Sequence, residues 1–466
     1  MAAVDVVVMA AGRGTRMKSA VPKVLHRLGG RALLDHVVAA AAGLKPRRLV
    51  VVTGHGAEQV SGAVRGFASA QGLACETVLQ QPQLGTGHAV QQALPLLPED
   101  GICLVLNGDV PLIETATLQG LLDACAGERL ALLTADMADP TGYGRILRGP
   151  QADVRGIVEQ KDASEDQRRI TEIYTGFMAA PNRLMRSWLS RLTPNNAQGE
   201  YYLTDVVGLA VADGVAVSAC MTQDQPQVDG VNSPVQLAAL ERVYQRRRAH
   251  ALMEQGVRLA DPARFDVRGA LACGADVEID VNCVFEGRVE IGDGARIGAN
   301  CVIANARIGA GAVIHPFTHI DGEKAGVQVG AGALVGPFAR LRPGAVLGDE
   351  VHIGNFVEVK NSTLGQGAKA NHLAYLGDAT VGERVNYGAG SITANYDGAN
   401  KHRTVIEADV HVGSNCVLVA PITLGAGTTV GGGSTLTKDT PAGALAVARG
   451  KQVHIANWQR PVKKKP

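Results

Sequence analysis

Two glycines follow the first apolar run of the chain, with the cationic residues Arg16 and Lys23 beyond them. Residues 9–17 read Met-Ala-Ala-Gly-Arg-Gly-Thr-Arg-Met, and Lys23 follows in a Pro-Lys-Val segment. Glycines let a backbone approach a polyphosphate, and the free N–H groups of such a loop can bind it. Arg16 and Lys23 could offset the charge that develops when a nucleophile attacks the α-phosphate of a nucleoside triphosphate. Two solvated cations after an ordinary turn are the alternative interpretation.

The glycine spacing excludes two common phosphate motifs. A Walker A loop needs Gly-Lys-Ser/Thr, which is missing after Gly14. A full dinucleotide fingerprint needs a third glycine where Met17 stands. The loop alone is therefore weak evidence, and the prediction of a nucleotide site depends on its combination with the two cations.

A carboxylate and a polar loop add to this set. Asp109 comes directly after the segment 102–108, whose first residues are apolar. A carboxylate at the end of a buried strand suits Mg²⁺ held together with substrate phosphates, although it could equally cap a turn. The polar loop contains Gln80, Gly85 and Thr86. Its amide and backbone groups could contact a base edge, or the loop could be an ordinary turn.

A histidine in the second half of the chain is a candidate general base. Acyl transfer from a thioester to an amine needs a base for the ammonium proton and a donor for the oxyanion. His372 could be that base, with Glu358 orienting its imidazole, although an isolated histidine in a repeat is more often a surface residue. Four polar residues lie one or two coils of the repeat away and would share its face: Arg342, Lys360, Tyr375 and Asn386.

The first half of the chain alternates apolar runs with helix-length segments. The runs at 6–11, 48–53 and 102–106 predict strands, and the segments 33–42 and 115–126 predict amphipathic helices. This order predicts an α/β, Rossmann-like domain with a mostly parallel sheet. Ligands on such folds bind at the carboxyl ends of the strands.

A six-residue repeat replaces this pattern after about Val277. The period fits neither a helix nor an alternating strand, and it predicts a parallel β-helix with one aliphatic side chain pointing inward from each side of a coil. The repeat breaks at 315–328 and 387–403, and such insertions form loops, often on the functional face. The repeating positions are Ile291, Ile297 and Ile303; Val329, Val335, Leu341, Leu347, Ile353 and Val359; and Ile406, Val412, Leu418, Leu424, Val430 and Leu436.

A helix separates the two halves. Ser233-Pro234 is a good start for a helix and Gly256 a good end. The end of the chain lacks the repeat and carries Trp458, which predicts a docked tail. The expected organisation is a nucleotide domain at 1–232, a linker helix at 233–256, a β-helix domain at 257–452 and a tail at 453–466.

Composition narrows the class of protein. The chain has 466 residues, 46% of them hydrophobic, and a formal net charge of +1, so nothing points to nucleic acid or a membrane as a partner. The N-terminus lacks a positively charged leader and no apolar run reaches membrane-spanning length, which predicts a soluble cytoplasmic protein without membrane insertion. The eight cysteines include no C-x-x-C pair and are expected to be buried free thiols.

Seven motifs together resemble the sugar-phosphate nucleotidyltransferases. They are Ala-Ala-Gly-x-Gly-Thr-Arg-Met, Pro-Lys-Val, Leu-Gly-Thr-Gly-His, Gly-Asp-Val-Pro-Leu, Pro-Thr-Gly-Tyr-Gly-Arg-Ile, Gly-Ile-Val-Glu and Gly-Glu-Tyr-Tyr-Leu-Thr-Asp. With the repeat domain behind them, essentially all 466 residues resemble the bifunctional bacterial enzymes that make UDP-N-acetylglucosamine. That family implies acetyl transfer from acetyl-CoA to glucosamine-1-phosphate. It then implies Mg²⁺-dependent uridylyl transfer from UTP to N-acetylglucosamine-1-phosphate, with release of pyrophosphate.

The resemblance implies roles in the nucleotide domain. Arg16 and Lys23 would assist catalysis, and Asp109 and Asn232 would bind Mg²⁺. Two positions depart from the family's pattern, because Asn107 stands where a Tyr is familiar and Tyr174 where an Asn usually contacts the sugar. The candidate substrate-binding residues are Met9, Ala10, Ala11, Gly12, Lys23, Gln80, Gly85, Thr86, Asn107, Gly108, Asp109, Gly144, Glu159, Tyr174 and Asn232. Among them, Gln80, Gly85 and Thr86 would contact uracil, and Gly144 and Glu159 the sugar.

The resemblance also implies roles in the repeat domain. His372 would be the catalytic base, and Arg342, Lys360, Tyr375 and Asn386 would bind glucosamine-1-phosphate. The family members are homotrimers with left-handed coils, an exception to the usual right-handed crossover that the period alone does not reveal. The candidate acetyl-CoA residues are Ala389, whose backbone would meet the thioester carbonyl, and Asn395, Tyr396, Ser414, Gly432 and Arg449.

Two other functions remain open from the sequence. One is a single-activity sugar nucleotidyltransferase whose β-helix serves only assembly or regulation. The other is a non-catalytic regulatory protein on the same scaffold. The presence of Arg16, Lys23 and Asp109 argues against the second, and the residues around His372 argue against the first.

Overall fold

The computed structural model describes residues 2–463. The last three residues of the predicted tail, 464–466, lie outside the described residues. The chain divides into two compact units, and the boundary lies between Tyr244 and Gln245. No helix within residues 2–463 combines the length and the apolar composition needed to cross a membrane.

The first unit is built on a mostly parallel sheet, in which β10 is antiparallel to its neighbours and β8 and β9 are antiparallel to each other. The strand order is β11-β7-β10-β6-β1-β4-β5, with β8 paired to β10 and β9 to β8. The three strands predicted from apolar runs are β1, β4 and β6, and all three are confirmed. The strands are β1 Val4–Ala10, β4 Arg48–Thr53, β5 Glu76–Leu79, β6 Ile102–Asn107, β7 Leu130–Asp136, β8 Gly144–Arg148, β9 Val154–Val158, β10 Glu172–Pro181 and β11 Val217–Thr222, beside a small hairpin of β2 Arg27–Leu28 and β3 Arg31–Ala32.

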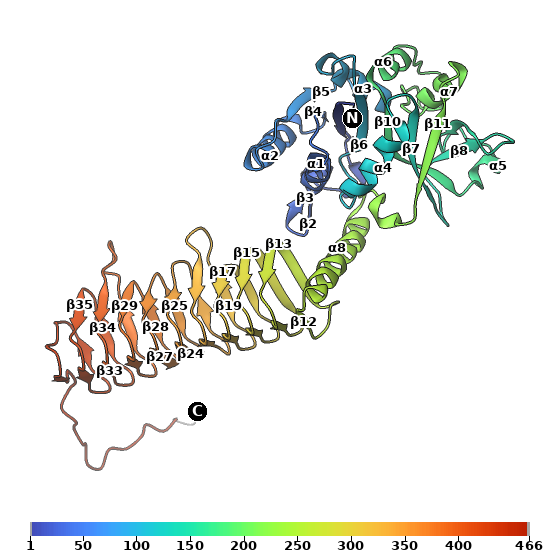
Figure 1. The fold of residues 1–466 in the computed structure, drawn as a ribbon. Coiled ribbons are helices and arrows are strands. Elements are labelled where there is room, and N and C mark those ends of the chain that lie inside the picture. Colours follow the sequence, from blue (N-terminus) through green and yellow to red (C-terminus); the bar gives the residue numbers. More distant parts are fainter. Residues whose placement is uncertain (1, 464–466) are drawn as a thin grey trace. The chain divides into compact units, whose positions relative to one another are not determined.

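Helices cover both faces of this sheet (Figure 1). Side chains of β1 alternate between two apolar cores: Val6 and Val8 pack with α1, α2 and α4, whereas Val7 packs with α3, α6 and α7. The helices are α1 Leu33–Ala42, α2 Ala57–Ala70, α3 Thr86–Ala93, α4 Thr115–Cys125, α5 Glu165–Arg168, α6 Asn182–Leu189 and α7 Asp205–Ala212, with short turns of 3-10 helix at η1 Thr15–Met17, η2 Lys23–Leu25, η3 Leu94–Leu96 and η4 Gln225–Gln227.

A long helix, α8 Pro234–Glu254, spans the boundary between the units. Leu240, in its first half, packs with Leu28 and Leu33 of the first unit. Leu252, in its second half, belongs to the core of the second unit. Each unit therefore uses part of one helix to close its own core.

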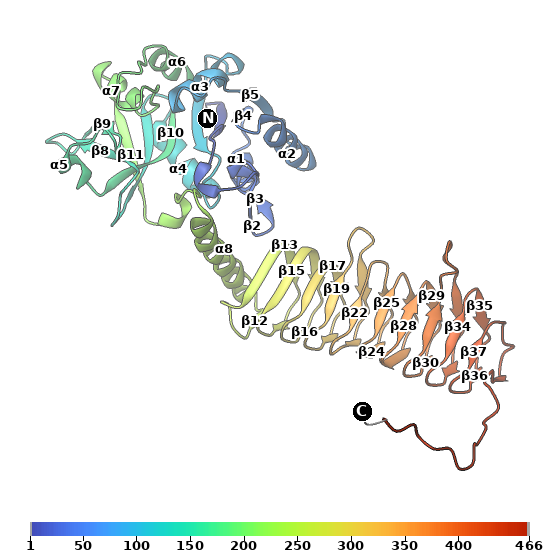
Figure 2. The same cartoon turned by 180° about the vertical axis from the view of Figure 1, so that it is seen from behind.

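The second unit is a left-handed parallel β-helix with three faces (Figures 1 and 2). Each coil passes from a strand of face 1 to a strand of face 2 and then to a strand of face 3. The long strands β13 Phe265–Cys273, β15 Cys283–Ile291 and β17 Val302–Ile308 begin the solenoid, and β17 pairs with both β19 and β20.

The strands of the three faces are short. Face 1 comprises β12 Arg258–Leu259, β14 Glu278–Ile279, β16 Arg296–Ile297, β18 Val313–Ile314, β21 Leu334–Val335, β24 His352–Asn355, β27 Lys369–His372, β30 Asn386–Tyr387, β33 His411–Val412, β36 Thr429–Val430 and β38 Leu445–Ala446. Face 2 comprises β19 His319–Asp321, β22 Arg340–Leu341, β25 Glu358–Lys360, β28 Tyr375–Gly377, β31 Ile392–Ala394, β34 Val417–Val419 and β37 Thr435–Leu436. Face 3 comprises β20 Val327–Val329, β23 Val346–Leu347, β26 Thr363–Leu364, β29 Ala379–Val381, β32 Thr404–Ile406 and β35 Ile422–Leu424.

The predicted repeat positions form the core of this solenoid. Every repeating aliphatic named above is buried, from Ile291 to Leu436. Small residues let the coils stack closely: a β-carbon at Gly354 would collide with the backbone oxygen of Asn371 in the next coil. All eight cysteines are free, as expected, although Cys75, Cys220 and Cys273 are only partly buried.

Both predicted breaks in the repeat are insertions at one edge. We call the edge between faces 1 and 2 the first edge and the edge between faces 2 and 3 the second edge. The loop 322–326 joins β19 to β20, and the loop 395–403 joins β31 to β32, so both insertions lie at the second edge. The two interruptions of the repeat are shorter than predicted. The strands before the loops, β19 and β31, still pair with strands of the neighbouring coils.

The tail differs from its prediction as a docked segment. Its described residues form no regular structure beyond a short turn, and Trp458 is 64% exposed. Val453 and Ile455 are exposed as well. Among the described residues of one chain, no apolar surface therefore covers these three side chains.

Candidate functional sites in the two units

The predicted phosphate loop and the predicted metal ligand meet at the carboxyl ends of adjacent strands. Met9 of β1 pairs with Asn107 of β6, and the Gly108 N–H donates to the Met9 carbonyl oxygen at 2.9 Å. Gly14 has a φ of 60°, and a β-carbon there would lie 2.6 Å from the β-carbon of Lys23. Glycine at this position therefore lets Lys23 fold back over the loop.

A hollow of about 320 Å³ opens at this edge of the sheet. Most residues predicted for nucleotide binding line it, together with four that sequence reasoning missed, Val24, Gln83, Ala89 and Glu200. Arg16 is not among the lining residues, and its side chain is exposed. The predicted residues that line the hollow are Met9, Ala10, Ala11, Gly12, Lys23, Gln80, Gly85, Thr86, Asn107 and Asp109.

One ammonium group joins both predicted metal ligands. Lys23 Nζ forms an ion pair with Asp109 Oδ2 and donates a hydrogen bond to Asn232 Oδ1 at 3.1 Å. Asn232 is brought here by its neighbour Val231, whose N–H donates to the Asp109 carbonyl oxygen at 2.9 Å. The carboxylate and the amide oxygen therefore converge on a single cation.

The predicted base-reading loop is held by its own side chains. Gln80 is 4% exposed and its Nε2 donates to the Gly85 carbonyl oxygen at 2.8 Å. Gly85 has a φ of 108°, and a β-carbon there would lie 2.6 Å from the Tyr201 oxygen. Gln83 donates to the Ala11 carbonyl oxygen, which ties this loop to the phosphate loop. Nothing in its local sequence distinguishes Gln83 from its neighbours.

The predicted sugar contacts form a second group beside the hollow. Gly144 pairs with Tyr174 across β8 and β10, and a β-carbon at Gly144 would lie 3.6 Å from the carboxylate oxygens of Glu159. Thr204, which sequence reasoning missed, donates to Glu159 Oε1 at 3.0 Å. Burial raises the pKa of the Glu159 carboxyl above its usual range.

The two unusual residues lie close to this group. Tyr174 is 8% exposed and its hydroxyl has no hydrogen-bond partner among the described residues. Burial, followed by the charge of Glu159, raises the pKa of Tyr174 well above its usual range, so the hydroxyl stays protonated. Asn107 packs against Gly176, whose missing side chain makes room for it.

In the second unit, His372 has a partner that the sequence did not reveal. Its Nδ1 lies 3.1 Å from Oδ1 of Asn355, which occupies the equivalent position of the preceding coil. An amide oxygen accepts a hydrogen bond, so Nδ1 carries the proton and Nε2 keeps its lone pair. The prediction that Glu358 orients the imidazole is wrong, because Glu358 pairs with Arg340 and with Arg342 at 2.8 Å.

Three cations gather beside Glu358 on face 2 and the second edge. Arg342 directly follows β22, Lys360 ends β25, and Lys401 approaches Lys360 from the loop 395–403. The Lys401 ammonium, burial and Arg342 lower the pKa of Lys360. Tyr375 of β28 pairs with Glu358 of β25, which lies in the preceding coil. Lys401 was missed because an insertion has no fixed place in the repeat.

The predicted acetyl-CoA residues form a ladder along the first edge. The N–H groups of Gly390, Asn415 and Gly433 donate to the carbonyl oxygens of residues in the preceding coil. The acceptors are His372, Ala389 and Ser414, and Arg449 Nη1 donates to the Gly432 carbonyl oxygen at 3.0 Å. Five predicted residues from successive coils therefore lie in one line: His372, Ala389, Ser414, Gly432 and Arg449.

Three predicted residues lie away from this line. Asn395 is buried at the second edge and donates to Asp378, which also accepts from Asn361. Tyr396 is 62% exposed in the same loop. Asn386 is exposed at the start of β30 on face 1, whereas Arg342, Lys360 and Tyr375 belong to face 2. One chain therefore does not bring Asn386 together with the other predicted sugar-phosphate residues.

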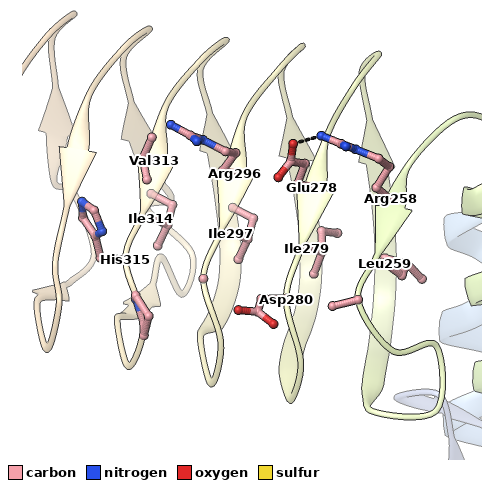
Figure 3. Close-up of a pocket in the computed structure, with 13 residues that line it drawn as sticks. Arg258, Leu259, Glu278, Ile279, Asp280, Arg296, Ile297, Val313, Ile314 and His315 are labelled. Atoms are coloured by element: carbon pink, nitrogen blue, oxygen red, sulfur yellow. Dashed lines mark ion pairs between the residues drawn. The ribbon is translucent and has the colours of Figure 1, made fainter.

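Another hollow, of about 480 Å³, lies over the first coils of face 1 (Figure 3). Arg258 and Glu278 form an ion pair across it, with Arg296 in the next coil and Asp280 and His315 farther along their strands. None of the residues predicted for either reaction lines this hollow.

Comparison with protein families and with curated proteins agrees with this division. The MobA-like NTP transferase domain matches residues 6–174, and the bacterial transferase hexapeptide (six repeats) matches residues 273–305, 326–361 and 403–438. A bifunctional protein GlmU of Polaromonas naphthalenivorans (strain CJ2) is 74% identical over 464 residues, which cover 99% of this chain and 98% of that protein.

Two further relatives carry the same name. The bifunctional protein GlmU of Methylibium petroleiphilum is 71% identical over 464 residues, covering 99% of this chain and 100% of that protein. That of Aromatoleum aromaticum is 58% identical over 461 residues, covering 99% of each chain. With identity of this level along nearly the full length and both domain types in the same order, the chain belongs to the family of bifunctional GlmU proteins.

Proposed function

We propose that the chain is a two-site transferase that acetylates glucosamine-1-phosphate and then uridylylates the product to UDP-N-acetylglucosamine. The observation that carries this proposal is the pairing of His372 with Asn355 on a solenoid that also carries a cationic cluster, in the same chain as the α/β hollow. In this assignment residues 1–232 transfer uridylyl groups and residues 257–452 transfer acetyl groups. The helix at 233–256 links them and the tail follows at 453–466. We propose that the enzyme acts in the cytoplasm, where acetyl-CoA and UTP are available to it.

In the acetyl transfer, His372 would act as the general base. Its Nε2 takes a proton from the amine of glucosamine-1-phosphate as the nitrogen attacks the thioester carbonyl carbon. The carbon–sulfur bond then breaks, and CoA leaves as a thiol when the His372 imidazolium returns the proton to the sulfur. Arg342, Lys360 and Lys401 supply positive charge for the sugar phosphate, and the N–H of Ala389 is the proposed donor to the thioester carbonyl oxygen.

In the uridylyl transfer, a phosphate oxygen of N-acetylglucosamine-1-phosphate would attack the α-phosphorus of UTP. The bond to the β-phosphate breaks and pyrophosphate leaves. Residues 9–12 offer backbone groups to the phosphates, while Glu159 and Tyr174 lie where the sugar would bind. The buried Tyr174 hydroxyl has no hydrogen-bond partner within residues 2–463, which supports a hydrogen bond to the sugar.

Asp109 and Asn232 fit a bound Mg²⁺. A carboxylate and an amide oxygen are ligands that this ion accepts, and the two already converge on one cation, the Lys23 ammonium. When bound, Mg²⁺ would neutralise charge on the phosphates during transfer. The protein's part is to hold these oxygens at the open edge of the sheet.

We also propose that three chains assemble and complete the acetyltransferase site. Asn386 lies on a different face from Arg342 and Lys360, so a residue of another copy would have to meet them. An apolar stripe on the first edge supports such contact. Its members are Phe317, Phe338, Phe356 and Leu373, which are 52%, 48%, 57% and 62% exposed, and the three rings stack at centroid distances of 5.0 and 5.4 Å.

Replacing Phe338 and Phe356 together by asparagine should weaken the trimer. Both residues have left-handed backbones, with φ of 56° and 57°, which asparagine tolerates, so the coils should remain folded. We expect a smaller mass by light scattering and a loss of acetyl transfer of at least about tenfold, with uridylyl transfer unchanged. Met221→Asn, on an exposed residue of the first unit, is the control. A double variant that stays trimeric would show that this stripe is not the contact.

One assay distinguishes the two-site enzyme from a single-activity nucleotidyltransferase. The protein should release CoA from acetyl-CoA when glucosamine-1-phosphate is added, and pyrophosphate from UTP when N-acetylglucosamine-1-phosphate is added. Absence of CoA release from the assembled protein would leave the β-helix a purely structural or regulatory role.

A further inference from the structure

The same two oxygens proposed as metal ligands are both engaged by Lys23. Its Nζ pairs with Asp109 Oδ2 and donates to Asn232 Oδ1 at 3.1 Å. Lys23 and Asp109 are largely buried, with side chains 14% and 17% exposed. The ammonium therefore lies between the ligand oxygens, where a bound cation would have to sit.

The two residues that carry these oxygens are held in place by the backbone rather than by the lysine. Asp109 follows the end of β6 after one residue, Gly108, and the Val231 N–H donates to the Asp109 carbonyl oxygen at 2.9 Å. A β-carbon at Gly230 would lie 3.8 Å from Asp109 Oδ2 and 3.6 Å from Asn232 Nδ2, so this turn packs against both side chains. The pair of oxygens is thus a preformed cation site with one carboxylate.

Two cations do not share such a site. An ammonium and a divalent ion in contact with the same pair of oxygens would be about 4 Å apart, where repulsion is strong in a partly buried pocket. Among residues 2–463 there is no cluster of three or more His, Cys, Asp or Glu side chains that could hold a metal ion on its own. A metal at Asp109 would therefore need further oxygen ligands, and the phosphates of a nucleotide supply them.

We infer that the Lys23 ammonium occupies the metal position of the nucleotide-free protein, and that the metal gains Asp109 and Asn232 only when a triphosphate draws Lys23 away. The inference rests on the proposed function, because it takes Asp109 and Asn232 as the metal ligands. The lysine can make this movement because its long side chain folds over the phosphate loop at Gly14 and lines the hollow beside Gly12. The metal then binds together with the nucleotide, and the nucleotide-free protein does not bind Mg²⁺ at this site.

Binding of Mn²⁺ to the full-length protein tests this exchange, because free Mn²⁺ gives an electron paramagnetic resonance signal that disappears on binding. Without nucleotide, Lys23→Met should bind Mn²⁺ about tenfold more tightly than the unmodified protein. Lys45→Met is the matched control, since it removes one charge at an exposed position after α1 and should change nothing. Adding Asp109→Asn to Lys23→Met should remove the gain.

The outcomes separate this inference from the metal assignment itself. If Lys23→Met and Lys23→Gln both fold, judged by circular dichroism, and neither binds Mn²⁺ more tightly than the unmodified protein, the exchange is refuted. If Asp109→Asn leaves Mn²⁺ affinity unchanged in the presence of a non-hydrolysable UTP analogue, the metal ligand itself was wrongly proposed. A gain in Lys23→Met that persists in the double variant would also overturn the exchange, because the metal would then bind elsewhere.

Discussion

Replacing His372 by alanine is expected to abolish acetyl transfer from acetyl-CoA while uridylyl transfer persists. Removal of a general base typically costs about 10²- to 10⁴-fold in rate. The uridylyl rate should stay unchanged, because the residues around Asp109 belong to the other unit and share no core with His372. Release of free CoA thiol and release of pyrophosphate, measured on the same preparation, give the two rates.

His319→Ala is the matched control for this variant. His319 is an exposed histidine on face 2 of the same solenoid and takes no part in the proposed site. It should keep full acetyl transfer. If His372→Ala retained more than about a tenth of the rate, a base other than His372 would have to accept the proton.

Asp109→Ala should have the opposite pattern, with loss of Mg²⁺-dependent pyrophosphate release and normal acetyl transfer. The change removes the one carboxylate of the proposed metal site and leaves Lys23 without its ion-pair partner. Loss of a group that stabilises charge in the transition state costs about 10²- to 10³-fold, and we expect at least the lower value here. Pyrophosphate release should be measured over a range of Mg²⁺ concentrations.

Asp123→Ala serves as the comparison for this change. Asp123 is an exposed acid on α4 whose carboxylate accepts a hydrogen bond from Gln119 at 2.8 Å, so the substitution removes one negative charge from the same unit away from the hollow. Normal acetyl transfer by Asp109→Ala would show that the chain still folds. Uridylyl transfer retained in that variant would remove Asp109 from the metal site.

The fold follows largely from two periodicities in the sequence. Apolar runs separated by helix-length segments gave β1, β4 and β6 correctly, since a strand buried on both faces must be apolar throughout. The six-residue spacing gave the solenoid core correctly, because each side of a coil can point only one aliphatic inward. Both are local patterns that each segment carries by itself.

Contacts between coils were harder to foresee. Asn355 and His372 meet because they take equivalent places in successive coils, 17 residues apart rather than a whole number of six-residue repeats. Farther along, the insertion 395–403 shifts the count for every later residue. Lys401 lies in that insertion, and Asp378 gains one of its two partners, Asn395, from it. Gln83 and Thr204 reach the first site through the tertiary fold, and their neighbours in sequence give no sign of it.

The exposed tail gives the protein a natural optical reporter. The chain has two tryptophans, and they lie in opposite environments: Trp188 is fully buried in the first unit, whereas Trp458 is 64% exposed. A buried indole emits at shorter wavelength than a hydrated one, so the fluorescence of the two can be separated. In a Trp188→Phe variant, a blue shift on raising the protein concentration would mark the burial of the tail by another chain, without any added label.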